Sequence, residues 1–444
     1  MTDERAWAGR RLHFIGIGGA GMSGLALVAR ALGAAVSGSD RAESATLARL
    51  RAAGIDARAG HDAANVPDGA EVVHSTAVPA ENPERAAARA RGLRELHRAD
   101  LLGEITALRR CIAITGTHGK TTTTSMVVHA LRGCGLDPGY LVGGELRSTG
   151  SNAGWGAGEW VVVEADESDR SLLKLHPDVA VLTNSELDHH ATYAGQRELD
   201  DTFRAFLARA TVGVVVWDRP ELRALVPVSG PEVVAYDVPS PVLDASGSRF
   251  DWRGIAVRLP VLGAHNALNA AAAIEACRLA GADPQQAAAA LADFPGAGRR
   301  FELLGTTAAG VPVYDDYAHH PTEVAATIAA ARTLAGGRGR IVAVFQPHLY
   351  SRTRELADAF GAALAAADLA IVLDVYPARE RAQDFPGVSA ALIAEAGADA
   401  GGAVVWEPDF DAAHARLQAA LHDDDVCLVM GAGDVDVLGR RLVS

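Results

Sequence analysis

Short apolar runs alternate with helix-length, alanine-rich segments along the whole chain. "RLHFIGI", "CIAIT" and "RIVAVF" are runs of this kind, and a turn and a helix-forming stretch follow each of them. Strands that alternate with helices predict parallel sheets covered by helices. Because 444 residues are too many for one core, the pattern predicts an α/β protein of two or three domains.

Three blocks of this alternation can be separated. The first covers residues 1–107, the second 108–297 and the third 298–444. The segment "DFPGAGRRFE" predicts a hinge between the last two blocks, because a proline and two glycines lie close together in it. Ligands of parallel sheets bind at the carboxyl ends of the strands, and polar clusters follow the strands of this chain at those ends.

The charge and the cysteine pattern limit the possible partners and the compartment. A net charge of −14 argues against nucleic acid or an anionic membrane as the main partner. The four cysteines lack the spacing of a zinc site or a disulfide framework, and no apolar stretch has the length of a membrane span. The polar start, "MTDERAWAGRR", has no signal-peptide pattern. We expect a soluble cytoplasmic protein, either a monomer or a homodimer.

The stretch "AITGTHGKTTTTSM" predicts a phosphate-binding loop between a strand and a helix. Only two residues separate Gly116 from Gly119, whereas the usual nucleotide signature has four at this point. Lys120 would lie against the β and γ phosphates of a nucleotide, and Thr121 would offer a hydroxyl to magnesium. Lysine occurs in this chain only at positions 120 and 174. This rarity favours the phosphate loop over the alternative, an ordinary strand-to-helix turn.

Acidic and polar residues follow two further strands of the second block. The runs "VVVEADESD" and "LTNSELDHHATY" contain Glu164, Asp166, Glu167, Asp169, Asn184, Glu186, Asp188 and His189. Magnesium prefers oxygen ligands and keeps several waters, so one of these carboxylates together with Thr121 would be enough to bind it. The alternative is that these acidic residues cap helices at the edge of a sheet.

The first and third blocks contain two further candidate sites. "GIGGAGMSG", with "SGSD" after it, is typical of a turn that binds a pyrophosphate, although the pattern alone is weak. "FQPHLYSRTRE" combines His348, Arg352 and Arg354, which suits a carboxylate or phosphate ligand. "YDDYAHHPTEV" contains two adjacent histidines, which suggest a metal, although neighbours in sequence rarely chelate one ion together. A surface loop and ordinary helix-surface arginines are the alternatives for these two segments.

Eight motifs in order make the chain similar to the Mur ligases of peptidoglycan synthesis. They are "HFIGIGGAGMSGLA", "ITGTHGKTTTT", "VEADESD", "TNSELDH", "HNALNA", "RRFE", "DDYAHHPTEV" and "FQPHLYSRT". The resemblance extends over essentially the whole chain. It implies an α/β fold of three domains: a Rossmann-like N-terminal domain, a central P-loop ATPase-like domain with a parallel sheet, and a Rossmann-like C-terminal domain.

The resemblance also implies the reaction and its substrates. It implies a ligase that uses ATP and Mg²⁺ to join L-alanine to the carboxylate of UDP-N-acetylmuramic acid through an acyl phosphate. The first alternative is a ligase of the same family that returns a whole tripeptide to this UDP-sugar. An NAD-dependent oxidoreductase and a regulatory P-loop ATPase are more remote alternatives, because neither accounts for all of the motifs.

The resemblance assigns roles to residues that match its motifs. For the ATP phosphates they are Gly116, Thr117, His118, Gly119, Lys120, Thr121 and Thr122, and for the rest of the nucleotide Asn266, Asn269 and Arg300. For the UDP-sugar they are Gly16, Gly18, Gly19, Gly21 and Asp40. For metal they are Thr121, Glu164 and His189, and for the amino acid Tyr317, His319, His348 and Arg352. The expected catalytic residues are Lys120, His189, His348 and Arg352.

One departure from the family pattern concerns the expected amino-acid pocket. The family usually has arginine after "FQPH", whereas this chain has Leu349. An anion contact expected at that point is therefore missing. The "LGAHNALNA" segment also lacks a usual proline, and the stretch from about residue 235 to 265 is shorter than the resemblance implies.

Overall fold

The computed structural model describes residues 4–190 and 192–444, and the chain divides into two compact units. The first unit comprises Met1–Glu186, Gln196–Asp237 and Ala271–Ala290, and the second comprises Leu187–Gly195, Val238–Ala270 and Leu291–Ser444. The first unit thus contains the amino-terminal sheet together with most of the second block of the sequence. The predicted boundaries at residues 107 and 297 remain a prediction.

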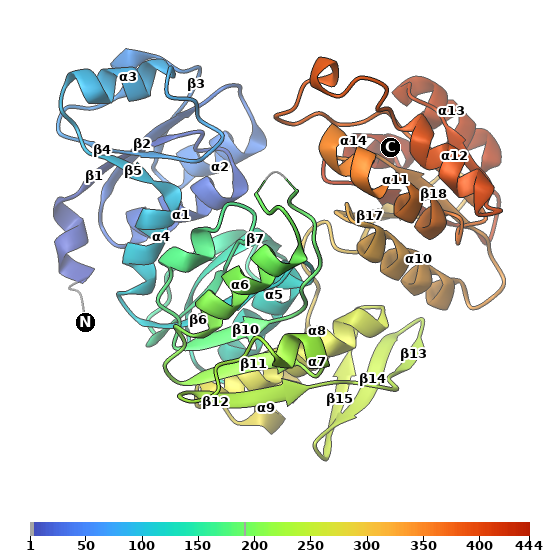
Figure 1. Ribbon diagram of the computed structural model, residues 1–444, viewed down its shortest axis with the longest axis horizontal. Coiled ribbons are helices and arrows are strands. Elements are labelled where there is room, and N and C mark those ends of the chain that lie inside the picture. The colour runs from blue at the N-terminus through green and yellow to red at the C-terminus, as the bar shows by residue number, and fades with distance from the viewer. Residues whose placement is uncertain (1–3, 191) are drawn as a thin grey trace. The chain divides into compact units, whose positions relative to one another are not determined.

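A five-stranded parallel sheet opens the first unit, in the order β3-β2-β1-β4-β5 (Figure 1). Its strands are β1 (Arg11–Ile15), β2 (Ala35–Asp40), β3 (Asp56–Ala59), β4 (Glu71–His74) and β5 (Glu95–His97). The helices that follow them are α1 (Ala20–Ala31), α2 (Ala45–Ala52), α3 (Pro83–Ala90) and α4 (Arg98–Thr106). Every strand pairs in parallel, as the alternating sequence pattern predicts.

The second sheet of this unit has seven strands in the order β12-β11-β10-β6-β9-β7-β8. Its strands are β6 (Arg110–Thr115), β7 (Gly139–Leu146), β8 (Ser151–Gly154), β9 (Trp160–Glu164), β10 (Val179–Leu182), β11 (Gly213–Trp217) and β12 (Glu232–Tyr236). Strands β6, β9 and β10 are buried almost throughout, which explains why they read as continuous apolar runs. The pairs are parallel except for the β7–β8 hairpin.

Helices surround this second sheet. They are α5 (Lys120–Gly133), α6 (Gln196–Leu207), α7 (Pro220–Arg223), α8 (Ala264–Leu279) and α9 (Pro284–Ala290). Short 3-10 helices span Glu4–Gly9, Ala63–Asn65, Ser171–Lys174, Leu291–Asp293 and Ala382–Asp384 along the chain. Helix α5 is the one that begins directly after the predicted phosphate loop.

The second unit contains a six-stranded sheet in the order β16-β17-β21-β18-β19-β20. Its strands are β16 (Glu302–Thr306), β17 (Pro312–Asp316), β18 (Ile341–Phe345), β19 (Leu369–Val372), β20 (Val404–Trp406) and β21 (Val426–Met430). Its helices are α10 (Pro321–Ala335), α11 (Tyr350–Leu364), α12 (Ala391–Asp399), α13 (Phe410–Ala420) and α14 (Asp436–Leu442). Two apolar clusters line this sheet, one containing Phe345 and Phe360 and the other Val344 and Leu438.

Two antiparallel elements of the second unit were not predicted from the alternating pattern. One is the separate sheet of β13 (Val242–Asp244), β14 (Gly247–Trp252) and β15 (Ile255–Leu259). The other is β16, which pairs antiparallel with β17 at the edge of the six-stranded sheet. Strand β14 alternates buried and exposed residues, so it lacks the continuous apolar run that marks the parallel strands.

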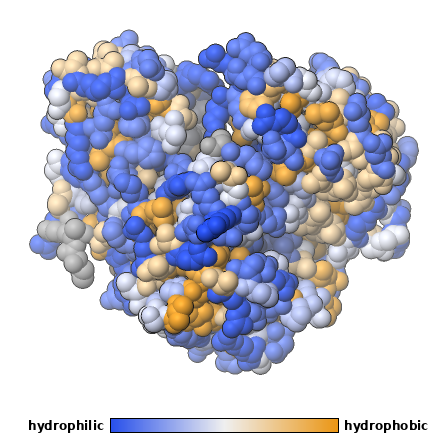
Figure 2. All heavy atoms as spheres, viewed as in Figure 1, coloured by the Kyte–Doolittle hydropathy of each residue, from blue (hydrophilic) through white to orange (hydrophobic). Residues whose placement is uncertain are grey.

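The visible face mixes polar and apolar residues, and the apolar ones extend over a broad area on the right of the view (Figure 2). Among the described residues, no helix combines the length and apolar character that crossing a membrane requires.

Candidate functional site

The loop between β6 and α5 has a backbone that only glycine accommodates at its first position. Gly116 has φ +128°, and a Cβ added there would lie 2.1 Å from Thr183 Oγ1. Gly119 caps α5 with φ +79°, a left-handed conformation that glycine adopts without steric cost. The loop therefore turns sharply, lies against the end of β10, and points the amino terminus of α5 outward as an anion site.

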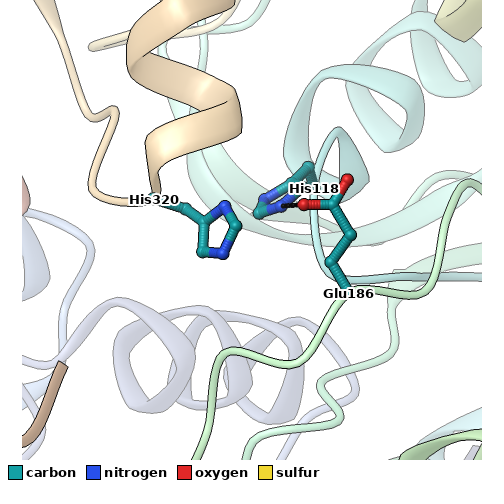
Figure 3. Close-up of side chains that lie close together, drawn as sticks. All are labelled: His118, Glu186 and His320. Carbon is teal, nitrogen blue, oxygen red and sulfur yellow. Dashed lines mark hydrogen bonds and ion pairs between the residues drawn. The ribbon is translucent and has the colours of Figure 1, made fainter. Parts of the chain in front are cut away.

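Residues that follow β10 hold this loop by hydrogen bonds. The His118 backbone N–H donates to Asn184 Oδ1 at 2.8 Å, and Thr117 Oγ1 donates to the Glu186 carbonyl at 2.7 Å. The His118 ring also faces the Glu186 carboxylate, 3.3 Å from it (Figure 3). The predicted strand-end residues Asn184 and Glu186 thus fix the shape of the loop.

Lys120 folds back onto its own loop. Its Nζ donates to the Gly116 carbonyl at 2.7 Å and to the Thr117 carbonyl at 3.0 Å, and it lies 3.0 Å from the Glu167 carboxylate. The Glu167 side chain is only 1% exposed. Burial lowers the pKa of Lys120, but the carboxylates of Glu167 and its neighbours outweigh burial and raise it. Lys120 is therefore a fixed positive charge in the loop.

Thr121 and Glu164 lie together, as the sequence predicts for a metal site. Thr121 Oγ1 is 3.0 and 3.2 Å from the two Glu164 carboxylate oxygens. The Gly143 backbone N–H donates to Glu164 at 2.8 Å and helps to orient the carboxylate. A hydroxyl and a carboxylate are oxygen donors that suit Mg²⁺, which binds few protein ligands and keeps several waters. These two residues therefore fit the expected cation.

The amino-terminal glycine turn lies at the carboxyl end of β1. The Ser39 carbonyl accepts the backbone N–H groups of Gly16 and Ile17 at 2.8 and 2.9 Å. Asp40 accepts the Gly18 N–H at 2.8 Å, so its carboxylate fixes the shape of the turn. Gly19 then caps α1, the helix in which Gly21 occupies the first turn. This arrangement supplies an anion site of the kind that the "GIGGAGMSG" pattern predicts.

The second unit brings together the residues predicted to bind the amino acid. They follow the carboxyl ends of β17 and β18, the two strands that flank β21. The rings of Tyr317 and His319 lie 5.4 Å apart between centroids, and those of His319 and His348 lie 6.4 Å apart. Arg352 Nη1 is 3.1 Å from His348 Nδ1. The sequence placed these residues in two separate motifs, and the fold joins them.

The two histidines have opposite tautomers. His319 Nδ1 is 2.8 Å from the Tyr317 carbonyl, which can only accept, so the proton is on Nδ1 and Nε2 has a lone pair. His348 Nδ1 faces Arg352, which can only donate, so the proton of His348 is on Nε2. Burial lowers the pKa of His319 to about 4 and, together with Arg352, that of His348 to about 3. Both rings are neutral near pH 7.

Arg352 itself is held by a buried ion pair. Its Nε is 2.5 Å from Asp188 Oδ1 and its Nη2 is 2.9 Å from Oδ2. Burial raises the pKa of Asp188, but Arg352 and His189 outweigh burial and hold it well below its usual range. His189 lies 3.6 Å from the same carboxylate. The structure thus gives Asp188, which the sequence noted only as a strand-end acid, the role of fixing Arg352.

Leu349 does not leave a gap where an arginine was expected. Its side chain is buried, and its backbone at the start of α11 has φ +73°. The Leu349 N–H donates to the Tyr376 carbonyl at 3.0 Å. By contrast, Arg354 is exposed and pairs with its neighbour Glu355. For Arg354 the alternative interpretation, an ordinary helix-surface arginine, is therefore correct.

Four more of the predicted site residues belong to the second unit. They are His189, Asn266, Asn269 and Arg300. At the start of α8, Asn266 Nδ2 donates to the Leu262 carbonyl at 2.7 Å, and Asn269 Nδ2 donates to Asn266 Oδ1 at 3.1 Å. Arg300 lies 3.6 Å from Glu323 and over the Tyr317 ring. Their roles toward a nucleotide or metal remain predictions.

Sequence reasoning missed two charged residues beside the loops. Glu167 lies in the quoted acidic run, but nothing in the run distinguished it as the partner of Lys120. Arg98 follows β5 and contacts Asp166 and Asp169. Its only sequence signal is its place just after a strand, which many arginines of this chain share.

Comparison with known proteins gives matches in three consecutive stretches. Residues 11–110 match the model "Mur ligase family, catalytic domain", residues 114–277 "Mur ligase middle domain", and residues 299–433 "Mur ligase, glutamate ligase domain". The three stretches correspond to the three α/β domains expected from the sequence and confirm that fold class.

Individual relatives agree with these matches. The chain is 46% identical to the UDP-N-acetylmuramate–L-alanine ligases of Mycobacterium sp. (strain JLS) and Thermobifida fusca, over 98% of this chain and 95% and 96% of theirs. The crystal structure of the UDP-N-acetylmuramate-alanine ligase of Thermotoga maritima superposes with a TM-score of 0.83 at 28% identity, covering 98% of both chains. A murein peptide ligase of Psychrobacter arcticus shares the fold, with a TM-score of 0.69 at 24% identity and 98% coverage of both.

Proposed function

The chain belongs to the Mur ligase family, and we infer that it joins L-alanine to the carboxylate of UDP-N-acetylmuramic acid at the expense of ATP, a step of peptidoglycan synthesis. The observation that carries this function is the full-length similarity to alanine-adding ligases. The sequence-based expectation of an ATP-dependent acid–amino-acid ligase is thereby confirmed. The proposed use of ATP supports the expected cytoplasmic location.

The chemistry requires two successive transfers. An oxygen of the muramyl carboxylate attacks the γ-phosphorus of ATP, and the bond to ADP breaks, which leaves an acyl phosphate. The neutral amine of L-alanine then attacks the acyl carbon, and the tetrahedral intermediate expels inorganic phosphate as the amide forms. The amine nitrogen loses one proton in this step. Because a carboxylate is a poor electrophile, phosphorylation supplies the leaving group that the amide bond requires.

The phosphate loop is the proposed binding site of the ATP phosphates. The shape of the loop, the amino terminus of α5 and the fixed charge of Lys120 support this role. Binding of the γ-phosphate replaces the contacts of Lys120 with its own loop carbonyls. Phosphoryl transfer needs mainly positioning and charge neutralisation, and these are what the loop offers.

Thr121 and Glu164 are the proposed ligands of Mg²⁺. Their 3.0 Å separation and their hard oxygen donors support this assignment. When bound, Mg²⁺ neutralises phosphate charge during transfer of the phosphoryl group. His189 remains the predicted histidine for a second ion, and its contact with Asp188 supports a fixed orientation of its ring.

The cluster of Tyr317, His319, His348 and Arg352 is the proposed site for the amino acid. The guanidinium of Arg352 suits a carboxylate, although Asp188 already occupies two of its nitrogens. The Nε2 lone pair of neutral His319 is suited to accept the proton that the attacking amine loses. His348, with its proton on Nε2, is suited to donate a hydrogen bond to a developing negative oxygen.

The alternative within the family is the ligase that attaches a whole tripeptide. The murein peptide ligase noted above shares the fold, but 24% identity supports no more than the fold. The alanine-adding relatives are 46% identical over nearly the full length, so the alanine reaction is favoured. An NAD-dependent dehydrogenase would leave the Lys120 loop and its partner carboxylates without a role.

The test is ATP-dependent phosphate release with UDP-N-acetylmuramic acid and Mg²⁺, with L-alanine, the tripeptide or no acceptor added. The mass of the nucleotide-sugar product is measured in parallel. A mass gain of one alanyl residue, with phosphate released only when L-alanine is present, is the expected result. A gain of the tripeptide would transfer the assignment to the recycling reaction. Phosphate release that is indifferent to the UDP-sugar would contradict both ligase functions.

A further inference from the structure

Arg98 lies between the two candidate anion sites of the first unit. It is the first residue of α4, directly after β5 of the amino-terminal sheet. Its Nη2 donates to Asp166 at 3.1 Å and to Asp169 at 2.8 Å, and both carboxylates follow β9 of the second sheet. A Cβ added to Gly21, in the first turn of α1, would lie 3.3 Å from Arg98 Nη1. The guanidinium thus faces the glycine turn on one side and the acidic segment on the other.

The guanidinium of Arg98 also has N–H donors that form no hydrogen bond within the described part of the chain, and one of them, Nη1, faces the glycine turn. Among the described residues, Arg98 forms hydrogen bonds through Nη2 alone, so Nε and Nη1 are unused. The Arg98 side chain is 20% exposed, so these nitrogens are only partly hydrated. An arginine whose unused donors lie beside the first turn of a helix that follows a glycine turn adds a positive charge to an anion site.

Asp166 connects Arg98 with the phosphate loop. Asp166 accepts a hydrogen bond from Arg98 and immediately precedes Glu167 in the chain. Glu167 is the buried partner of Lys120 and lies 3.0 Å from its Nζ. A movement of Arg98 would change the position of the acidic segment that holds Lys120.

The same two sites are joined by a second path. Asn152, on β8, donates to the Ala20 carbonyl at the start of α1 at 2.8 Å. Strand β7, the hairpin partner of β8, holds Glu164 through the Gly143 N–H. The amino-terminal helix is therefore hydrogen-bonded to the hairpin that orients Glu164.

We propose that Arg98 is a positioning residue that couples the two substrates: it contacts the diphosphate of the UDP-sugar through Nε and Nη1 while Nη2 holds the Asp166–Asp169 segment beside Lys120. This inference rests on the proposed function for the identity of the two ligands. Occupation of the glycine turn then fixes the guanidinium, and through Asp166 it fixes the acidic segment in the arrangement that binds ATP. The affinity for one ligand rises when the other is bound, by the same factor in both directions.

The test measures nucleotide affinity with and without a bound UDP-sugar. The dissociation constant of a non-hydrolysable ATP analogue with Mg²⁺ is determined by calorimetry, alone and with saturating UDP-N-acetylmuramic acid. For the unchanged protein we expect the UDP-sugar to tighten nucleotide binding about 10-fold, within the usual range of coupling between two sites. In Arg98→Ala the factor falls to about 1, and UDP alone binds about 10-fold more weakly.

Two further variants separate coupling from a merely structural role. Arg98→Lys keeps one positive charge but cannot contact both sides, so UDP affinity is partly restored while the coupling factor remains near 1. Arg49→Ala is the matched control: it removes another ion pair between the helices of the first sheet and the strands of the second, that of Arg49 on α2 with Glu145 on β7, and both of these side chains are exposed. The coupling factor of Arg49→Ala is expected to equal that of the unchanged protein.

The outcomes are distinct. A coupling factor of 1 in the unchanged protein, or an unchanged factor in Arg98→Ala, overturns the inference. A fall in melting temperature of Arg98→Ala with intact coupling also overturns it, because Arg98 would then be structural only. Failure of the unchanged protein to bind UDP-N-acetylmuramic acid or to form the alanyl product would instead overturn the proposed function.

Discussion

Arg352 and Asp188 form a buried, two-pronged ion pair, with Nε and Nη2 each facing one carboxylate oxygen at 2.5 and 2.9 Å. Both side chains are less than 5% exposed, at 4% and 3%. The pair aims the remaining nitrogen of Arg352 at His348 and thereby sets the tautomer of that ring. The orientation of a predicted catalytic histidine thus depends on an acid that follows β10, about 160 residues earlier in the chain.

Replacing Arg352 by lysine tests this arrangement. Arg352→Lys keeps the charge but loses the fork that holds both oxygens of Asp188 and the His348 ring. We expect kcat/KM for L-alanine to fall by about 10- to 100-fold, a loss of about 1.4 to 2.8 kcal/mol of transition-state stabilisation, with a smaller change in KM for ATP. Steady-state kinetics with each substrate varied in turn measures this. Equal losses for all three substrates would argue that Arg352 supports the fold rather than the amino-acid site. Arg354→Lys, at the exposed neighbouring arginine, is the matched control.

Lys120 and Glu167 allow activity and stability to be separated. Lys120→Ala removes the proposed phosphate contact and also leaves the buried carboxylate of Glu167 without its charge partner. We expect ligation to fall at least about 1,000-fold, on the scale of losing a main transition-state contact, and the unfolding free energy to fall by about 3 kcal/mol. Adding Glu167→Gln should restore most of the stability and none of the activity. Thermal melts and phosphate-release assays on both variants check this. Recovery of activity in the double variant would contradict the assigned role of Lys120.

At position 349, we expect the glycine variant to be more stable than the alanine variant, which is the reverse of the usual order. The φ of +73° at Leu349 is in a region that costs a non-glycine residue about 1 to 3 kcal/mol. Glycine and alanine both lose the buried leucine side chain, but only glycine also releases the strain. Leu349→Gly should therefore be more stable than Leu349→Ala by about 1 kcal/mol or more. At Leu356, inside α11, the usual order should hold, with alanine more stable than glycine by about 1 kcal/mol. The melting temperatures of the four variants measure this difference. If alanine is more stable than glycine at both positions, the backbone of Leu349 is not strained.

The buried carboxylate of Glu84 should make the stability of the fold depend on pH in the acid range. Glu84 is buried in the first turn of α3 and accepts hydrogen bonds from Ser39 on β2 at 2.6 Å and from Asn65 at 2.9 Å. Burial raises the pKa of Glu84, but hydrogen bonds from His13, Ser39 and Asn65 outweigh burial and lower it from 4.5 to about 2. A carboxyl with a lowered pKa stabilises the fold above its unfolded value, so this contribution is complete above about pH 4.5 and is lost as the pH falls toward 2.

Glu84→Gln should therefore reduce the unfolding free energy by about 3 kcal/mol near pH 7. The difference from the unchanged protein should stay constant down to about pH 4.5 and shrink below it. Calorimetric melts from pH 7 to 3 measure this difference. Glu43→Gln, at an exposed acid whose pKa is also lowered by its partner Arg51, is the control and should change the pH dependence far less, because solvent screens this pair. A difference that grows as the pH falls would contradict the lowered pKa.

The sequence predicted elements that depend on local pattern. Continuous apolar runs identified β6, β9, β10, β18 and β21, because strands buried on both faces leave that pattern whatever their neighbours are. The glycine loop could be predicted for the same reason, since Gly116 and Gly119 adopt backbone conformations that follow from residue type. By contrast, β14 is half-buried and antiparallel, so buried and exposed residues alternate along it. It therefore has no continuous apolar run, which was the signal used to identify the other strands.

The sequence could not predict side-chain partners that are distant along the chain. Glu164, Asp166 and Glu167 were all visible as strand-end acids. The pairing of β9 beside β6 places Glu164 against Thr121, and the turn after β9 places Glu167 against Lys120. Arg98 is one of many arginines that follow a strand or lie on a helix. Its contact with Asp166 depends on how two sheets pack, and no spacing in the sequence records this.

The rarity of lysine has a practical consequence for chemical labelling. The chain offers an amine-reactive reagent only two lysine side chains. Lys174 is 61% exposed and pairs with Asp100, so it reacts readily, whereas Lys120 is 14% exposed and is held by its loop. A slow second modification, read by mass spectrometry on the peptide around residue 120, therefore reports when the loop opens and when a nucleotide protects it. The unaltered protein already contains a single-site probe of its own phosphate loop, with the other lysine as an internal standard.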